Sequence, residues 1–130
     1  MKRIFYILLI GLVIFAWVSS KKPSSFLNYN LNGKTYKLMT AKNSSEFQKG
    51  LMYYRSKKEL NGADGMIFIF PDKDYRSFWN DNTYLDLDVY WIDGERVAGK
   101  DFLPSIEKSK EVVVIESKEK VDKVIEIVTF

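Results

Sequence analysis

The segment from Leu85 to Trp91 alternates in polarity, and this alternation limits the fold more than any other feature of the sequence. LDLDVYW carries leucine, valine and tryptophan at every second position, with aspartate and tyrosine between them. Because successive side chains of a strand point to opposite faces, this period of two predicts a half-buried strand. Asp93-Gly94 follows, and Asp-Gly is typical of a tight hairpin turn. The sequence therefore predicts a returning strand from Glu95 to Lys100.

Further strand signals lie on both sides of this hairpin. Asn32-Gly33 separates two alternating runs and predicts another hairpin from about Phe26 to Ala41. GMIFIF, which begins at Gly65, predicts a buried strand that Pro71 stops. Short apolar runs also occur at residues 77–79, in EVVVIE and in VIEIVTF. Many short strands without repeated helices between them are typical of an antiparallel architecture.

One segment has a helical pattern. Ser45 and Gln48 have the spacing of a capping box, and we expect a helix from about Ser45 to Tyr53. Gly50 inside it costs roughly 1 kcal/mol relative to alanine, which indicates close packing at this position. The predicted fold is mainly β: a small antiparallel β-barrel or sandwich with one short helix.

The N-terminus differs from the rest of the chain. Lys2 and Arg3 precede the unbroken apolar run IFYILLIGLVIFAWV, which ends at Val18. This run spans about 22 Å as a helix, less than the ~30 Å hydrocarbon core of a membrane. We therefore expect residues 1–20 to be a signal peptide or an N-terminal membrane anchor, 21–25 a linker and 26–130 a β-rich domain. The expected location is extracytoplasmic: secreted, periplasmic or in the cell envelope.

The composition excludes several classes of ligand and catalytic mechanism. The formal net charge is +3, of which Lys2 and Arg3 supply two, so the remaining domain gives no electrostatic reason to expect nucleic acid. The sequence has no cysteine and no histidine. Disulfides, a lipoprotein thiol, histidine-dependent nucleophilic catalysis and the usual zinc, copper and haem ligand sets are therefore excluded. We expect no cofactor and no metal site, because the aspartates at 81, 86, 88 and 93 do not form a calcium-binding loop.

Several motifs together resemble a known family. GLMYYR begins at Gly50, GADGMIFIFP at Gly62 and FWNDNTYLDLDVYWID at Phe78, with FLP and VIEI following. Their order and spacing resemble the domain of unknown function 192 family of bacteria and archaea, over roughly Tyr36 to Ile127. The resemblance implies a compact β-rich fold, often exported behind an N-terminal signal, with no established activity.

The family pattern can be placed residue by residue. The matching positions are Gly50, Leu51, Met52, Arg55, Gly65, Met66, Phe68, Phe70, Phe78, Trp79, Asn82, Thr83, Leu87 and Asp88. Asn80 and Asp81 stand where methionine and lysine are usual, and Asp86 replaces a proline. These departures lie in the most distinctive motif and bear on any inherited ligand preference.

Five of the matching residues form the predicted ligand site: Arg55, Trp79, Asn82, Thr83 and Asp88. Tryptophan offers a stacking surface, and the amide, hydroxyl and charged groups offer hydrogen bonds to a sugar or small polar molecule. We expect Asp88 to pair with Arg55 or with the Asn82-Thr83 turn. Its replacement by alanine would then cost about 3 to 5 kcal/mol, against less than about 1 kcal/mol for Asp86 or Asp93.

Two functions fit these residues. The first is a non-catalytic module that binds a small polar or carbohydrate ligand, or an envelope partner. The second is a carboxylate-dependent hydrolase acting on envelope glycans. In that case Asp86 and Asp88, two residues apart on one strand face and about 6.5 to 7 Å apart at the backbone, would be its acid and base.

Overall fold

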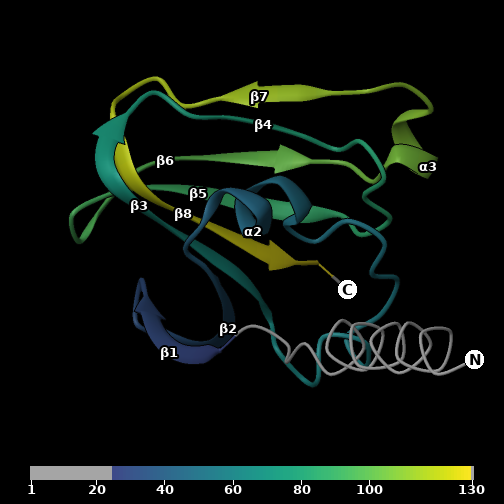
Figure 1. Ribbon diagram of the computed structural model, residues 1–130, viewed down its shortest axis with the longest axis horizontal. Helices are drawn as coiled ribbons and strands as arrows, with labels where there is room; N and C mark the ends of the chain where they lie inside the picture. The colour runs from purple at the N-terminus through teal and green to yellow at the C-terminus, as the bar shows by residue number, and fades with distance from the viewer. Residues whose placement is uncertain (1–24, 130) are drawn as a thin grey trace, which may run out of the picture.

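The structure, a computed structural model, describes residues 25–129 of the chain. This part consists of short strands with two short helices (Figure 1). The elements in chain order are β1 (Phe26–Leu31), β2 (Lys34–Ala41), α2 (Ser44–Lys49), β3 (Gly65–Asp74), β4 (Ser77–Trp79), β5 (Leu87–Asp93), β6 (Arg96–Leu103), α3 (Ile106–Ser109), β7 (Val114–Glu116) and β8 (Val121–Val128).

Six strands form one mixed sheet in the order β1-β2-β3-β8-β5-β6, and β4 pairs with β7 in a separate ribbon. The strands are antiparallel to their neighbours except β2 and β3, which run parallel. They can run parallel because the long connection containing α2 returns the chain to the end where β2 began. The predicted mainly β class is confirmed. The sheet is open and mixed, however, whereas a closed antiparallel barrel was one of the two expected forms.

Both predicted hairpins are present. Asn32 and Gly33 join β1 to β2 with φ values of 52° and 86°, and Gly94 joins β5 to β6 with a φ of 64°. Asparagine and glycine tolerate this left-handed region, which tight hairpin turns require. The turn chemistry therefore identified both hairpins correctly.

The helix predictions need two corrections. Asn43, not Ser45, caps α2: its Oδ1 accepts a hydrogen bond from the Glu46 N–H at 3.0 Å. The helix ends at Lys49 rather than Tyr53, because Gly50 turns the chain with φ 47° and ψ −128°. The second helix, α3, was not predicted.

The predicted end of the GMIFIF strand is also wrong. β3 continues past Pro71 to Asp74. Its pairing with β8 is interrupted between Ile69 and Asp74, where the register shifts. Proline is tolerated at such an irregularity because no ladder hydrogen bond from its nitrogen is needed.

The six-stranded sheet has two faces: a covered face, on which α2 and β4 pack, and an opposite face. On the covered face, Phe68, Val89 and Val124 belong to a buried cluster against which Phe47 of α2 and Phe78 of β4 pack. Figure 1 shows α2 in front of this face and the β4–β7 ribbon along one side of it. The opposite face has its own apolar cluster, formed by Leu31, Leu38, Ile67, Ile92, Ile125 and Ile127.

The predicted export segment, residues 1–20, lies outside the described residues. Within residues 25–129, none of the helices has the length and apolar character needed to cross a membrane.

Candidate functional site

A cavity of about 340 Å³ lies between the covered face, α2 and β4. Its walls are largely aromatic. The aromatic residues that line it are Phe47, Phe68, Phe70, Tyr75, Phe78 and Trp79. Two of them come from the sheet strand β3, three from the covering elements α2 and β4, and Tyr75 from the loop between β3 and β4, so the fold as a whole forms this space.

The aromatic rings of the wall contact one another. Phe47 lies 4.6 Å from Phe70 between ring centroids, and Phe68 lies 4.8 Å from Phe78 in an edge-on arrangement. Phe78 in turn lies 5.8 Å from Trp91 in the core beneath. Such pairs fix ring orientation as well as burying area, so the cavity wall is held by packing on both sides.

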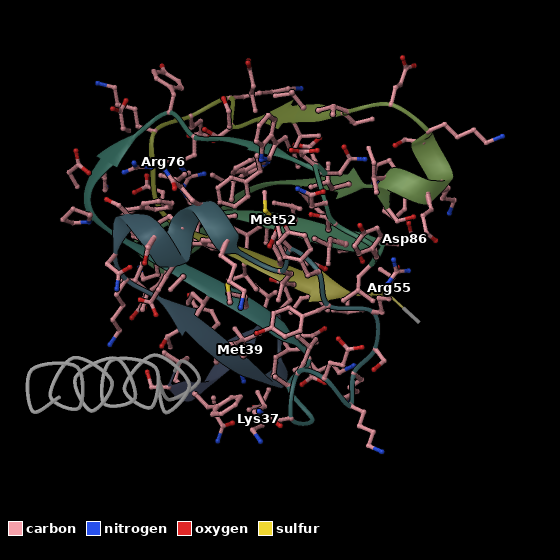
Figure 2. The ribbon with its side chains drawn as sticks, turned by 45° about the vertical axis from the view of Figure 1, so that its right-hand side comes forward. Lys37, Met39, Met52, Arg55, Arg76 and Asp86 are labelled. Atoms are coloured by element: carbon pink, nitrogen blue, oxygen red, sulfur yellow. The ribbon has the colours of Figure 1, made fainter. Side chains whose placement is uncertain are left out.

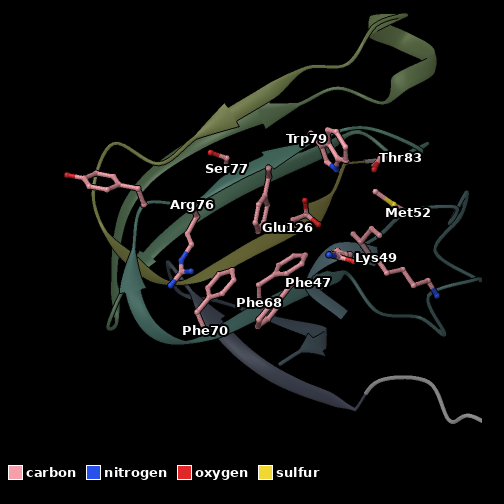
Figure 3. Close-up of a pocket in the computed structure, with 15 residues that line it drawn as sticks. Phe47, Lys49, Met52, Phe68, Phe70, Arg76, Ser77, Trp79, Thr83 and Glu126 are labelled. Carbon is pink, nitrogen blue, oxygen red and sulfur yellow. The ribbon is translucent and has the colours of Figure 1, made fainter. Parts of the chain in front are cut away.

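Glu126 projects into this aromatic cavity from the central strand β8 (Figure 3). In the sheet it lies between Met66 of β3 and Val89 of β5, and it is only 5% exposed. No donor among residues 25–129 forms a hydrogen bond or ion pair with its carboxyl group. Every fully buried side-chain nitrogen or oxygen in this part of the chain has a hydrogen-bond partner. The carboxyl oxygens of Glu126 have no partner among these residues, so they are not fully enclosed and open to the cavity.

The environment of Glu126 favours its neutral form. Burial raises the pKa of this carboxyl from 4.5 to about 8, and no neighbouring charge offsets the effect. A carboxyl group with such a pKa can donate a proton near neutral pH, or become charged when a cation approaches. Glu126 is therefore the chemically distinctive group of the cavity.

Two glycines allow the chain to approach Glu126 closely. A Cβ on Gly50 would lie 3.3 Å from the Phe68 ring and 3.9 Å from Oε1 of Glu126. On Gly65 it would lie 1.8 Å from the Glu126 carbonyl oxygen, which no side chain can tolerate. The expected close packing at Gly50 is confirmed, and both glycines belong to sequence motifs that the family resemblance identified.

Arg76 lies on one side of Glu126 in the cavity, and Trp79 and Thr83 lie on the other (Figure 3). The Arg76 guanidinium stacks on Phe70 at 3.9 Å and donates hydrogen bonds to the Asp72 carbonyl at 2.6 Å and carboxylate at 3.1 Å. Its charge is thus already compensated by Asp72.

Trp79 connects the cavity to an outer groove. It is 52% exposed, and it lines the groove together with Ser45, Gln48, Lys49, Met52 and Tyr53. Gln48, Lys49 and Met52 also line the inner cavity. The cavity and the groove therefore adjoin at the four residues that line both, Gln48, Lys49, Met52 and Trp79.

The structure divides the predicted site. Trp79 and Thr83 line the cavity. Asn82 lies outside its lining and contacts Tyr53, donating to the hydroxyl at 3.3 Å. Arg55 forms an ion pair with Glu107 at 2.9 Å, near α3.

The expected pair of Arg55 and Asp88 is not formed. Arg55 stacks on Tyr84 at 3.9 Å, while Asp88 lies 3.7 Å from Lys100 on the opposite face. Asp88 points away from the cavity because it alternates along β5 with Leu87 and Val89, whose side chains belong to the covered face. The alternation was read correctly, and it places Asp88 on the face that does not carry the cavity.

Asp86 is more than a solvent-facing residue. Its Oδ1 accepts a hydrogen bond from the Ser105 N–H at 2.8 Å, and Lys108 lies 3.4 Å from Oδ2. Figure 2 shows Asp86 and Arg55 at one end of the molecule and Arg76 at the other. The small cost expected for replacing Asp86 did not take these two contacts into account.

Sequence reasoning missed Glu126, although a signal was present. VIEIV is apolar on both faces apart from this glutamate, which is typical of a central strand buried on both sides. A charged residue at such a position is rare unless it is paired or functional. Within residues 25–129, no cluster of three or more acidic side chains is arranged to hold a metal ion.

Comparisons with known proteins agree with this architecture. The family model DUF192, described as Uncharacterized ACR, matches residues 27–129. A crystal structure of a candidate transcription regulator from Sinorhizobium meliloti is 25% identical, with a TM-score of 0.64 over 85% of each chain. A protein of unknown function from Novosphingobium aromaticivorans is 21% identical, with a TM-score of 0.61 over 84% of this chain and 82% of its own, and shows the fold alone. The comparison with curated proteins gives no match.

Proposed function

Because this chain belongs to the DUF192 family, whose description names no activity, we propose its function from its own cavity: an extracytoplasmic module that binds a small polar ligand beside Glu126. The proposed site retains Trp79 and Thr83 from the sequence prediction. It replaces Arg55, Asn82 and Asp88 with the residues around Glu126.

A single observation carries the proposal: a buried carboxyl group without a protein partner opens into an aromatic cavity. Placing an ionisable group in such surroundings costs stability unless it is paired. Proteins accept that cost mainly where the group serves a function. A cavity that combines apolar walls with polar groups is the usual form of a small-molecule site, and 340 Å³ lies at the small end of such sites, which start at about 300 Å³.

The alternative, a glycan hydrolase that uses Asp86 and Asp88, receives no support from the geometry. Neither residue lines the cavity. Asp86 is engaged by Ser105 and Lys108, and Asp88 lies near Lys100. An acid–base pair needs both carboxyl groups at one substrate, so binding without catalysis is the simpler proposal.

The extracytoplasmic location rests on the sequence. Lys2 and Arg3 followed by the apolar run to Val18 are typical of an export signal or anchor. Cell fractionation followed by mass spectrometry of the N-terminus tests this part. An intact chain confined to the cytosol would exclude it.

Chemical-shift mapping tests the binding site. The purified, isotopically labelled full chain is titrated with small probes: glucose, N-acetylglucosamine, glycine, acetate and n-butylammonium. We expect at least one probe to shift the amide signals of Gly50, Thr83 and Glu126, and Glu126→Gln to weaken that response. Shifts confined to the opposite face around Asp88, or no shifts from any probe, would contradict the proposal.

A further inference from the structure

We propose that the ligand is a small organic cation, whose ammonium group lies between the Glu126 carboxylate and the rings of Phe47, Phe68 and Phe78. This inference rests on the proposed function and specifies the chemical class of the ligand. It concerns charge, which the presence of a cavity alone does not determine.

The first argument is the missing counter-charge. Asp72, beside the cavity, has a cationic partner in Arg76 at 3.1 Å. Glu126 has none among residues 25–129. A bound cation would supply the partner that the protein omits, and a charged hydrogen bond or ion pair in this low-dielectric space is stronger than in water.

The second argument is the nature of the wall. Aromatic rings attract cations through their quadrupole, and a desolvated cation can gain about 2 kcal/mol from one such ring. The rings of Phe47, Phe68 and Phe78 line the same space as Glu126. A negative group surrounded by rings suits an ammonium group better than an anion or a sugar, which needs many hydrogen-bonding partners.

The cationic side chains that line the cavity contact other residues, so they do not compete with this ligand for Glu126. Arg76, before β4, is held by Asp72 and Phe70. Lys49 of α2 directs its Nζ over the Tyr54 ring at 5.1 Å. The remaining ionisable side chain of the lining is Tyr75, and the neighbours of Glu126 in the sheet, Met66 and Val89, are apolar.

The inference predicts proton release on binding. With a pKa of about 8, Glu126 is largely protonated in the free protein at neutral pH. A cation stabilises the charged carboxylate, so binding below this pH must expel the proton. The Kd for a permanent cation should therefore rise about tenfold for each pH unit below 8.

Choline and 3,3-dimethyl-1-butanol provide a matched test, because they share a shape and differ in charge. Both are titrated calorimetrically into the full chain between about pH 6 and about pH 9. At the upper pH we expect choline to bind at least about tenfold more tightly than the alcohol, which corresponds to about 1.4 kcal/mol. Titrations in buffers of different ionisation enthalpy should show release of one proton at the lower pH.

n-Butylammonium and n-butanol form a second pair, in which the cation can donate hydrogen bonds. Glu126→Gln should abolish the preference for the cation in both pairs and remove the pH dependence. Glu116→Gln on the exposed side of β7 is the matched control and should leave both unchanged. Thermal melts of the two variants establish that each is folded.

The outcomes separate this inference from the proposed function. If the alcohols bind as tightly as the cations, or more tightly as pH falls, Glu126 acts as a neutral donor and the cation inference is overturned. If neither cation binds but another probe shifts the cavity signals, the proposed function survives and the inference fails. If no probe of any class binds, both fail.

Discussion

The two faces of the central sheet treat acidic residues in different ways. On the covered face, Glu126 is 5% exposed and has no partner in the described part of the chain. On the opposite face, Asp88 lies 3.7 Å from Lys100, and their side chains are 28% and 52% exposed. The same alternation of strand residues generates both environments. They differ because α2 and β4 cover one face and do not cover the other.

This difference distinguishes an ordinary solvent-facing acid from an unusual enclosed one. An exposed acid near a lysine is the ordinary condition of a strand facing water and contributes little to stability. An enclosed acid without a partner lowers stability when charged, and the fold places it where α2 and β4 leave a cavity. The covered face is therefore the place to look for ligand binding.

Gly65→Ala should have the largest effect. The added methyl group would lie 1.8 Å from the carbonyl oxygen and 2.8 Å from the carbonyl carbon of Glu126. Because both atoms belong to the backbone of β8, β3 and β8 must separate at the centre of the sheet. We expect a loss on the order of 5 kcal/mol in the free energy of unfolding, or failure to fold, measured by urea denaturation.

Gly33→Ala is the control for that substitution. A Cβ at Gly33 meets no atom within 4 Å, and its cost comes from a φ of 86°. This strain should amount to about 1 to 2 kcal/mol. Equal effects of the two substitutions would show that the close approach of β3 to Glu126 is unimportant.

The second-largest effect should be a pH dependence of stability that comes from Glu126. Its pKa is raised by burial from 4.5 to about 8. Between these values the folded state holds a proton that the unfolded state has released, so stability falls as pH rises through the window. Glu126→Gln removes this penalty. As the pH rises from about 4 to about 9, the free energy of unfolding of this variant should therefore increase relative to that of the wild type by on the order of 4 kcal/mol.

Urea titrations across this pH range measure the effect, with Glu116→Gln as the exposed control. The control should follow the wild type at every pH. Parallel curves for the wild type and Glu126→Gln would mean that the carboxyl group has the same pKa in the folded and unfolded states. The contrast between the faces would then disappear.

Asp86→Ala should have an intermediate effect. The substitution leaves the Ser105 N–H without its 2.8 Å acceptor and removes the contact with Lys108. Ser105 is buried and precedes α3, so its N–H cannot readily recruit water. We expect a loss of about 1 to 2 kcal/mol, measured by thermal and urea unfolding. Asp86→Asn, which keeps an acceptor oxygen, should recover about half of it.

Local patterns predicted the strands well because short-range chemistry determines them. Asn32, Gly33 and Gly94 supply the left-handed turn positions, and the alternation from Leu85 to Trp91 requires one buried face. The parallel pairing of β2 with β3 could not be predicted in this way. It depends on where the long connection after α2 directs the chain, and no local pattern specifies that.

The candidate site was predicted only in part for a related reason. Trp79 and Thr83 reach the cavity, but Arg55 and Asp88 are carried elsewhere by α3 and by the alternation of β5. Period-two alternation shows which residues share a face, and it does not show which face is covered. Glu126 could have been found from its charge inside VIEIV, whereas its cavity depends on contacts among segments far apart in the sequence.

Asp88→Ala should have the smallest effect, contrary to the expectation from sequence. That expectation required a buried pair with Arg55, and the structure gives Asp88 a partly exposed lysine at 3.7 Å instead. The carboxylate can be replaced without leaving an enclosed charge, so the change in unfolding free energy should stay within about 1 kcal/mol. Raising the salt concentration should reduce even this effect, because dissolved ions screen a solvent-exposed pair. Urea denaturation of Asp88→Ala, Asp86→Ala and the wild type in one series measures the order. A loss at Asp88 larger than at Asp86 would show that the opposite face holds a structural acid as well, and the distinction between the two faces would no longer hold.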